Sequence, residues 1–203
     1  PLNNSYYIDI DGKRVDFGYG IAVRGPKLCV PKKIADLLTP ANPYEDVEQG
    51  DWFYDSVIYA THNKLMNGLE QTVFGPNDSM TRGMFVTVLH RYEGEPEAGD
   101  NPFTDVKENW YYVDPIAWAS SEGIVNGKTA TEFAPDDNVT REQIAAILYR
   151  YAESKDMDVS AKGDISKFTD GDDVSAYAEE AISWANGAGI ITGKQNNMLA
   201  PTG

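Results

Sequence analysis

Residues 103–151 read FTDVKENWYYVDPIAWASSEGIVNGKTATEFAPDDNVTREQIAAILYRY, and this stretch carries the pattern that decides the fold. The same pattern occurs upstream at a constant spacing of 59 residues. The upstream residues are Asp46, Gly68, Phe74, Pro76, Thr81 and Arg82, and they recur as Asp105, Gly127, Phe133, Pro135, Thr140 and Arg141. A third copy follows after 65 to 66 residues and contains Asp170, Trp184, Gly193 and Pro201. Self-similarity of this kind indicates a repeat architecture.

Each repeat predicts a helix, a loop and a second helix. The first helix follows an aromatic-x-Asp opening and is expected to end before Gly123 in the second repeat and before Gly189 in the third. The loop ends at Thr81 or Thr140, which are well placed as N-caps of the second helix. The second helices have apolar residues at spacings of three and four, namely Phe85, Val88, Leu89 and Tyr92, and then Ile144, Ile147, Leu148 and Tyr151. Such spacing places one apolar stripe on each helix.

Neither helix of a repeat can bury its stripe alone, so the repeats must pack together. The sequence therefore predicts a mainly α fold in which three helix-loop-helix repeats form a pseudo-threefold bundle, with a linear solenoid as the alternative. We place the repeats at residues 44–94, 95–154 and 155–203. The third repeat stops before its own Thr-Arg pair and second helix. We hypothesise that residues 31–38, which read like a degenerate second helix, complete it in cis or from a neighbouring copy.

Residues 1–43 are expected to form a small β-hairpin region and a short helix. Apolar and polar residues alternate on both sides of Asp11-Gly12, which is a strong hairpin signal. The segments 20–23 and 27–30 flank Arg24-Gly25-Pro26 and predict a second hairpin. Because the chain opens at Pro1 rather than Met, we expect a processed or cut fragment.

The composition argues against several classes of partner. The chain of 203 residues has 32 acidic and 17 basic side chains and a net charge of −15. Binding to nucleic acid or to an anionic bilayer requires clustered Lys and Arg, so we expect neither. No apolar stretch is long enough for a membrane span. Cys29 is the only cysteine, which excludes an internal disulfide and a metal site built from cysteines.

Catalytic patterns are not visible in the sequence. The only histidines are His62 and His90, and no metalloprotease, nucleophile-elbow or phosphate-loop motif occurs. The acidic residues of segment 170–173 loosely suggest a calcium loop, but they lack the full EF-hand spacing and we interpret them as solvated loop charge. We therefore predict that the chain is not an enzyme and has neither a cofactor nor a metal site.

The repeated motifs resemble the S-layer homology domain, which typically occurs as a triplet. The resemblance covers residues 44–203 and rests on F-x-D-V, a Trp, A-x-x-x-G-I-x-x-G, F-x-P and T-R in successive order. The second helix of this family usually begins Thr-Arg-Ala-Glu. Here the two helices begin at Thr81 and Thr140 with T-R-G-M and T-R-E-Q, so the Glu at the fourth position is lost in both.

The resemblance implies non-covalent anchoring at the bacterial cell wall or surface layer. Its implied partner is an acidic secondary cell-wall polysaccharide attached to peptidoglycan, often one that bears a pyruvate ketal. A carboxylate on a sugar suits an Arg fork, helix N-terminal amides and an aromatic plate. The expected ligand-binding residues are Asp46, Trp52, Gly68, Arg82, Asp105, Trp110, Gly127, Arg141, Asp170 and Gly193.

Alternative interpretations remain for the residues and for the whole chain. The three aspartates could cap the first helices, and Arg82 and Arg141 could pair with nearby acids. Trp118 and Trp184 are interpreted as core residues. The third repeat has Tyr177 where Trp is expected, so its pocket is predicted to be the weakest. The chain could also be a structural subunit of a self-assembling surface layer or filament, or the C-terminal anchor of a larger exported enzyme.

Overall fold

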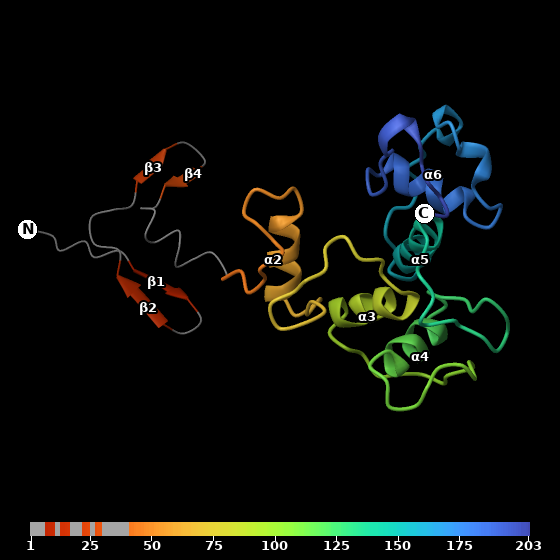
Figure 1. Ribbon diagram of the computed structural model, residues 1–203, viewed down its shortest axis with the longest axis horizontal. Helices are drawn as coiled ribbons and strands as arrows, with labels where there is room; N and C mark the ends of the chain where they lie inside the picture. The colour runs from red at the N-terminus through yellow and green to blue at the C-terminus, as the bar shows by residue number, and fades with distance from the viewer. Residues whose placement is uncertain (1–6, 11–12, 17–21, 25–26, 30–40) are drawn as a thin grey trace, which may run out of the picture. The chain divides into compact units, whose positions relative to one another are not determined.

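The computed structural model describes residues 41–203 and, upstream of them, the backbone of four short strands (Figure 1). Strand β1, Tyr7–Ile10, pairs antiparallel with β2, Lys13–Asp16. Strand β3, Ala22–Arg24, pairs in the same way with β4, Lys27–Cys29. Both predicted hairpins are confirmed. The hypothesised helix at residues 31–38 lies outside the described residues.

The described part of the chain downstream of the hairpins is helical, which confirms the mainly α prediction. The helices are α2, Tyr54–His62; α3, Arg82–Tyr92; α4, Val113–Ser121; α5, Arg141–Ser154; and α6, Glu179–Gly187. Short 3-10 helices occur at Ile165–Lys167, Gly171–Asp173 and Gln195–Asn197. None of the described helices combines the length and the apolar character that a membrane crossing requires.

The helix boundaries follow the predicted caps. The hydroxyl of Thr81 accepts a hydrogen bond from the N–H of Met84, and Thr140 forms a capping box with Gln143. Gly123 and Gly189 follow the C-caps of α4 and α6 with φ of 70° and 74°, a left-handed conformation that favours glycine.

The chain divides into two compact units, and the division does not follow the sequence repeats. One unit contains Asn67–Phe74 and the residues up to Asn63, while the other contains Lys64–Met66 and Gly75–Gly203. The first unit therefore holds α2, and the second holds α3 to α6. Within the second unit, α3 packs on α4 and α5 packs on α6. Each second helix thus packs on the first helix of the following repeat.

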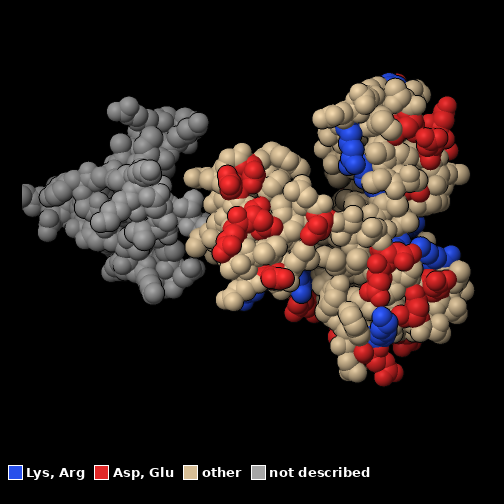
Figure 2. Space-filling model, in the orientation of Figure 1, with Lys and Arg blue, Asp and Glu red and all other residues tan. Residues whose placement is uncertain are grey.

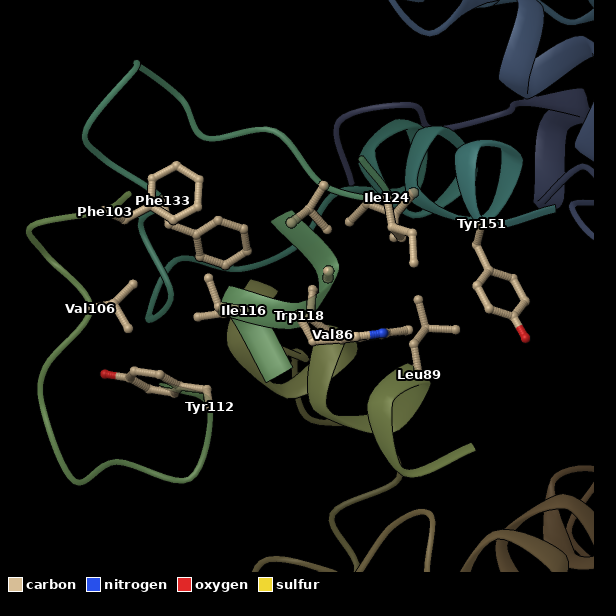
Figure 3. Packing of buried hydrophobic residues seen from close by; sticks show 13 residues of the cluster. Val86, Leu89, Phe103, Val106, Tyr112, Ile116, Trp118, Ile124, Phe133 and Tyr151 are labelled. Carbon is tan, nitrogen blue, oxygen red and sulfur yellow. The ribbon is translucent and has the colours of Figure 1, made fainter. Parts of the chain in front are cut away.

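The second unit has two apolar clusters. The first is formed by α3, α4, α5 and the loops around Phe103 and Phe133 (Figure 3). The second lies between α5 and α6 and includes Ala145, Ile182 and Leu199. Trp118 belongs to the first cluster and Trp184 to the second, as predicted for core residues. Helix α5 contributes to both clusters and so connects the second repeat to the third.

Polar contacts also join the C-terminal ends of α3 and α5. Glu93, which follows α3, accepts hydrogen bonds from the hydroxyl of Tyr151 and the ammonium of Lys155. These bonds, from Lys155 first and then from Tyr151, lower the pKa of Glu93. The two second helices are therefore tied at this end by a shared carboxylate.

Candidate functional site

Arg82 begins α3 in the first repeat, but its side chain lies in the loop of the second repeat. Its Nε donates to the carbonyl of Phe133 at 2.9 Å, and Nη2 donates to the carbonyl of Asn126 at 3.2 Å. Nη1 donates to Oε1 of Gln143 at 3.1 Å, and the guanidinium lies 4.5 Å from the centre of the Phe133 ring. Arg82 is only 5% exposed. Its partners are carbonyl oxygens and an aromatic face, not the acids considered above.

Arg141 repeats this arrangement one repeat later. Its Nε donates to the carbonyl of Leu199 at 2.8 Å, and Nη2 donates to the carbonyl of Thr192 at 2.8 Å. Leu199 and Thr192 follow Phe133 and Asn126 by the same 66 residues. The structure therefore has a recurring joint, in which the first Arg of a second helix binds two loop carbonyls of the following repeat.

A second arginine approaches the loop of the second repeat from α5. Nη1 of Arg150 lies 3.5 Å from the carbonyl of Ile124. Its counterpart in the first repeat, Arg91, donates in the same way to the carbonyl of Leu65 at 3.2 Å. Arg82 and Arg150 thus reach one loop from two different helices.

These two arginines line a pocket of about 330 Å³. Its wall is formed by residues of all three repeats, namely Arg82, Asn126, Gly127, Lys128, Gln143, Ala146, Ile147, Arg150 and Tyr177. We call this pocket the arginine pocket. Burial lowers the pKa of Arg82 and Arg150, yet a guanidinium stays charged in proteins.

The arginine pocket is locally basic on an acidic chain. In the described part of the chain, every ion pair has lysine as its cation, and within the pocket Lys128 pairs with Asp137. Arg82 and Arg150 have no such carboxylate partner among the described residues. Figure 2 shows acidic atoms scattered over the face in view and basic atoms in fewer places. The charges of Asp105 and Asp137 act on Arg82, and that of Glu153 acts on Arg150, but none of these carboxylates forms an ion pair with either arginine. Arg150 is less buried than Arg82, so its guanidinium is the more accessible of the two to an anion from outside.

Tyr177 is held on the pocket wall by a buried carboxylate. Glu142, in the first turn of α5, accepts hydrogen bonds from the N–H of Ser175 at 3.0 Å and from the hydroxyl of Tyr177 at 2.9 Å. Burial and the bond to Glu142 raise the pKa of Tyr177 to about 12. Sequence reasoning did not select Arg150, Gln143 or Tyr177. The recurrence of Arg91 as Arg150 was the signal that could have identified the first of them.

A second cavity, of about 560 Å³, lies beside α3 and the start of α4. Its lining residues Thr87, Arg91 and Tyr111 are the repeat counterparts of Ala146, Arg150 and Tyr177. Here the arginine is accompanied by three acids, Glu95, Glu97 and Asp114. The two cavities are thus lined by residues at equivalent repeat positions but differ in the sign of their charge. Of the two, the arginine pocket suits an anion.

The predicted aspartates close the loops of their own repeats. Asp105 accepts from the N–H groups of Phe133 and Ala134 at 2.9 and 2.7 Å. Asp170 accepts from those of Leu199 and Ala200, both at 2.7 Å. In the other unit, Asp46 accepts from the N–H of Phe74 at 2.8 Å. The helix-cap interpretation is wrong, because α2 and α4 begin after Phe53 and Tyr112 without a side-chain cap.

Asp170 gives a pH-dependent prediction. Burial raises the pKa of this carboxyl, but the two loop N–H groups and Arg141 outweigh it, so the pKa lies below its ordinary value of 3.8. A lowered pKa stabilises the fold above the unfolded-state pKa, and this stability is lost as the pH falls through the folded-state value. We expect Asp170→Asn to unfold at lower urea concentration than wild type at pH 7. The two urea midpoints should converge on acidification toward pH 3, and a constant gap would contradict this role.

The predicted glycines are required by packing. A Cβ on Gly127 would lie 2.4 Å from the carbonyl oxygen of Thr129 and 2.5 Å from that of Glu132. A Cβ on Gly193 would lie 2.7 Å from the ring of Phe168, and one on Gly68 would lie 2.7 Å from the ring of Tyr44. Of these three glycines, Gly127 lines the arginine pocket.

The predicted tryptophans do not line the arginine pocket. Trp52 is 93% exposed and makes an edge contact with Phe53. Trp110 is 49% exposed, stacks on Tyr112 and lies under the ammonium of Lys107 at 5.1 Å.

Of the predicted site residues, the structure brings Arg82 and Gly127 together in the arginine pocket, while Asp105 holds the loop that supplies Gly127. In the third repeat, Arg141 and Asp170 bind the backbone of the loop that contains Gly193. No group of three or more His, Cys, Asp or Glu suited to a metal occurs in residues 41–203.

Comparison with known proteins identifies the repeats. The family described as the S-layer homology domain matches residues 43–83, 102–145 and 167–203. An endoglucanase of Bacillus sp. (strain KSM-635) is 33% identical over 79% of this chain and 17% of its own length. The surface-layer 125 kDa protein of Lysinibacillus sphaericus is 35% identical over 61% of this chain and 10% of its own. The cellulosome-anchoring protein of Acetivibrio thermocellus is 24% identical over 63% of this chain and 29% of its own. The chain thus spans less than a third of each of these relatives.

Proposed function

The chain belongs to the S-layer homology domain family, and from this premise we propose that it is a non-catalytic module that anchors a larger protein to the bacterial cell wall. Its proposed ligand is an acidic, carboxylate-bearing secondary cell-wall polysaccharide. The observation that carries this proposal is the arginine pocket, where Arg82 and Arg150 face the same cavity and neither forms an ion pair among the described residues.

The pocket suits a carboxylate on a sugar for three reasons. Two guanidiniums offer charge-assisted hydrogen bonds, which are stronger than neutral ones. Gln143 and the backbone at Gly127 add polar groups for hydroxyls, and Tyr177 adds an aromatic face. The net charge of −15 repels anions at long range, so a bound anion must be recognised by close contacts in this pocket.

The relatives support an anchoring role on a larger protein. Their names include an endoglucanase, a surface-layer protein and a cellulosome-anchoring protein, and each shares only a small part of its length with this chain. A segment that recurs in proteins of such different kinds fits a common attachment module. We propose that the protein is located outside the cell, in the wall or surface layer, and that any catalytic activity of the whole protein resides in other segments.

The test is a pull-down on purified cell-wall sacculi, before and after removal of the non-peptidoglycan polymer. We expect wild-type protein to bind intact sacculi and to lose binding after removal. Arg150→Gln should bind at least about tenfold more weakly, because a hydrogen bond to a charged group contributes about 1.5–3 kcal/mol. Arg91→Gln is the matched control, since it removes the same charge from the repeat-related acidic cavity.

Three outcomes would contradict the proposal. Binding that survives polymer removal would exclude the polysaccharide as ligand. Equal weakening by Arg150→Gln and Arg91→Gln would exclude the arginine pocket as its site. Absence of binding by folded protein, together with concentration-dependent oligomers, would favour a self-assembling surface subunit instead.

A further inference from the structure

The chain contains three Asn-Gly pairs, and the structure places them in different surroundings. They are Asn67-Gly68, Asn126-Gly127 and Asn186-Gly187. Asn126 is exposed on the rim of the arginine pocket, and Asn67 is exposed at the matching position of the first repeat. Asn186 lies in the last turn of α6, where its side chain donates to the carbonyl of Ile191 at 3.0 Å.

We infer that Asn126 is a site of spontaneous deamidation that places a negative charge in the arginine pocket. The N–H nitrogen of Gly127 attacks the side-chain carbonyl carbon of Asn126, and a C–N bond forms. The bond from that carbon to the side-chain nitrogen breaks, and ammonia leaves with the proton from the Gly127 nitrogen. Water then opens the cyclic imide at either carbonyl and leaves aspartate or isoaspartate. No oxidant or reductant takes part.

The local structure leaves both reacting groups of this pair available. Within the described residues, neither the Asn126 side chain nor the Gly127 N–H makes a hydrogen bond. Gly127 has no side chain to shield its nitrogen. The N–H of Gly187, by contrast, belongs to the hydrogen-bonded ladder of α6, so its nitrogen is held away from the Asn186 carbonyl carbon.

The packing around Gly127 prevents its replacement by any other residue. Gly127 cannot acquire a side chain, because a Cβ would overlap two carbonyl oxygens. Only a change at position 126 can remove the Asn-Gly pair. The third repeat shows such a change, since Thr192 precedes Gly193 at the matching position. That loop still presents its carbonyl to Arg141, so Thr is compatible with the backbone contact.

The modification changes the pocket in two ways. A carboxylate at position 126 adds a negative charge to the lining that holds Arg82 and Arg150, so it competes with an external anion for them. In isoaspartate the main chain runs through the former side chain, and the backbone carbonyl that accepts from Nη2 of Arg82 becomes the free carboxylate, so the loop is lengthened at this contact. This consequence for ligand binding rests on the proposed function, whereas the reaction itself does not.

The reaction is tested on the purified protein alone. The chain is incubated under native, mildly alkaline conditions, and proteolytic peptides are analysed by mass spectrometry at intervals. We expect Asn126 and Asn67 to convert to the acid while Asn186 stays an amide. Conversion of all three at one rate, or no conversion at Asn126 while unfolded protein converts, would overturn the inference.

The consequence is tested by comparing fresh and aged protein on sacculi. We expect aged wild type to bind about tenfold more weakly than fresh protein, which corresponds to 1.4 kcal/mol. Aged Asn126→Thr should retain the binding of its own fresh sample, whereas the matched control Asn67→Thr should still lose binding on ageing. Equal binding by fresh and aged wild type, despite conversion at Asn126, would overturn the charge effect. A fresh wild type that does not bind would refute the proposed function and leave the mass result standing.

Discussion

Replacement of Arg82 by methionine is expected to lower the free energy of unfolding by about 3 kcal/mol or more. The substitution keeps an apolar stem but removes every donor. The carbonyls of Phe133 and Asn126 then lose this donor, and Oε1 of Gln143 keeps only its capping bond from Thr140, at a position where Arg82 is 5% exposed. A buried polar group left without a hydrogen bond costs about 1–3 kcal/mol, so the loss of three such bonds outweighs any gain from an apolar side chain.

Arg141→Met is the matched control for this prediction. Arg141 makes two of the corresponding bonds, to Leu199 and Thr192, and it is more exposed than Arg82. Water can replace some of its lost bonds, so the loss should be smaller. Urea denaturation followed by circular dichroism measures both variants. Equal destabilisation by the two substitutions would contradict the idea that burial makes Arg82 contribute more than Arg141 to the free energy of unfolding.

Replacement of Gly127 by alanine is expected to have a similarly large effect, a loss of about 3 kcal/mol in the free energy of unfolding. The added Cβ would approach two backbone oxygens at 2.4 and 2.5 Å and the ring of Phe103 at 2.5 Å. Backbone oxygens cannot move aside as a flexible side chain does, so the loop must open. Opening would also displace the carbonyl of Asn126 from Arg82 and disrupt the arginine pocket.

Gly50→Ala is the control, because a Cβ there would meet no atom within 4 Å. We expect its free energy of unfolding to stay within about 0.5 kcal/mol of wild type. The sacculus pull-down should show loss of binding for Gly127→Ala alone. A Gly127→Ala protein with wild-type stability would refute the crowded-loop explanation.

The sequence predicted the elements of this fold well and their side-chain partners less well. Periodicity and cap residues such as Thr140 and Gly123 are local signals, so the helices and their ends could be derived from neighbouring residues. The buried positions of Trp118 and Trp184 followed from the same periodicity.

The lining of the candidate pocket could be predicted only in part, because it depends on contacts between repeats. A repeat alignment gives Arg82 and Arg141 equivalent positions, but it cannot tell which loop each guanidinium enters. The aspartates recur at every repeat, which is also the pattern expected of ligand-binding residues. In the structure, Asp105 and Asp170 accept hydrogen bonds from loop N–H groups. We interpreted Tyr177 with the pocket of its own repeat, whereas the structure places it in the lining of the pocket that contains Arg82.

The packing of each second helix on the following repeat also has a consequence for gene shuffling. Residues 75–140 run from the second helix of one repeat through the loop of the next, and they contain Arg82 and both of its acceptor carbonyls. An exchange of DNA with crossovers near residues 75 and 140 transfers a joint intact. Crossovers at residues 95 and 154 separate Arg82 from its acceptor carbonyls. In such a hybrid, the loop from one parent must fit the arginine of the other parent. Recombination at the apparent repeat boundaries should therefore yield fewer folded hybrids than recombination within the loops.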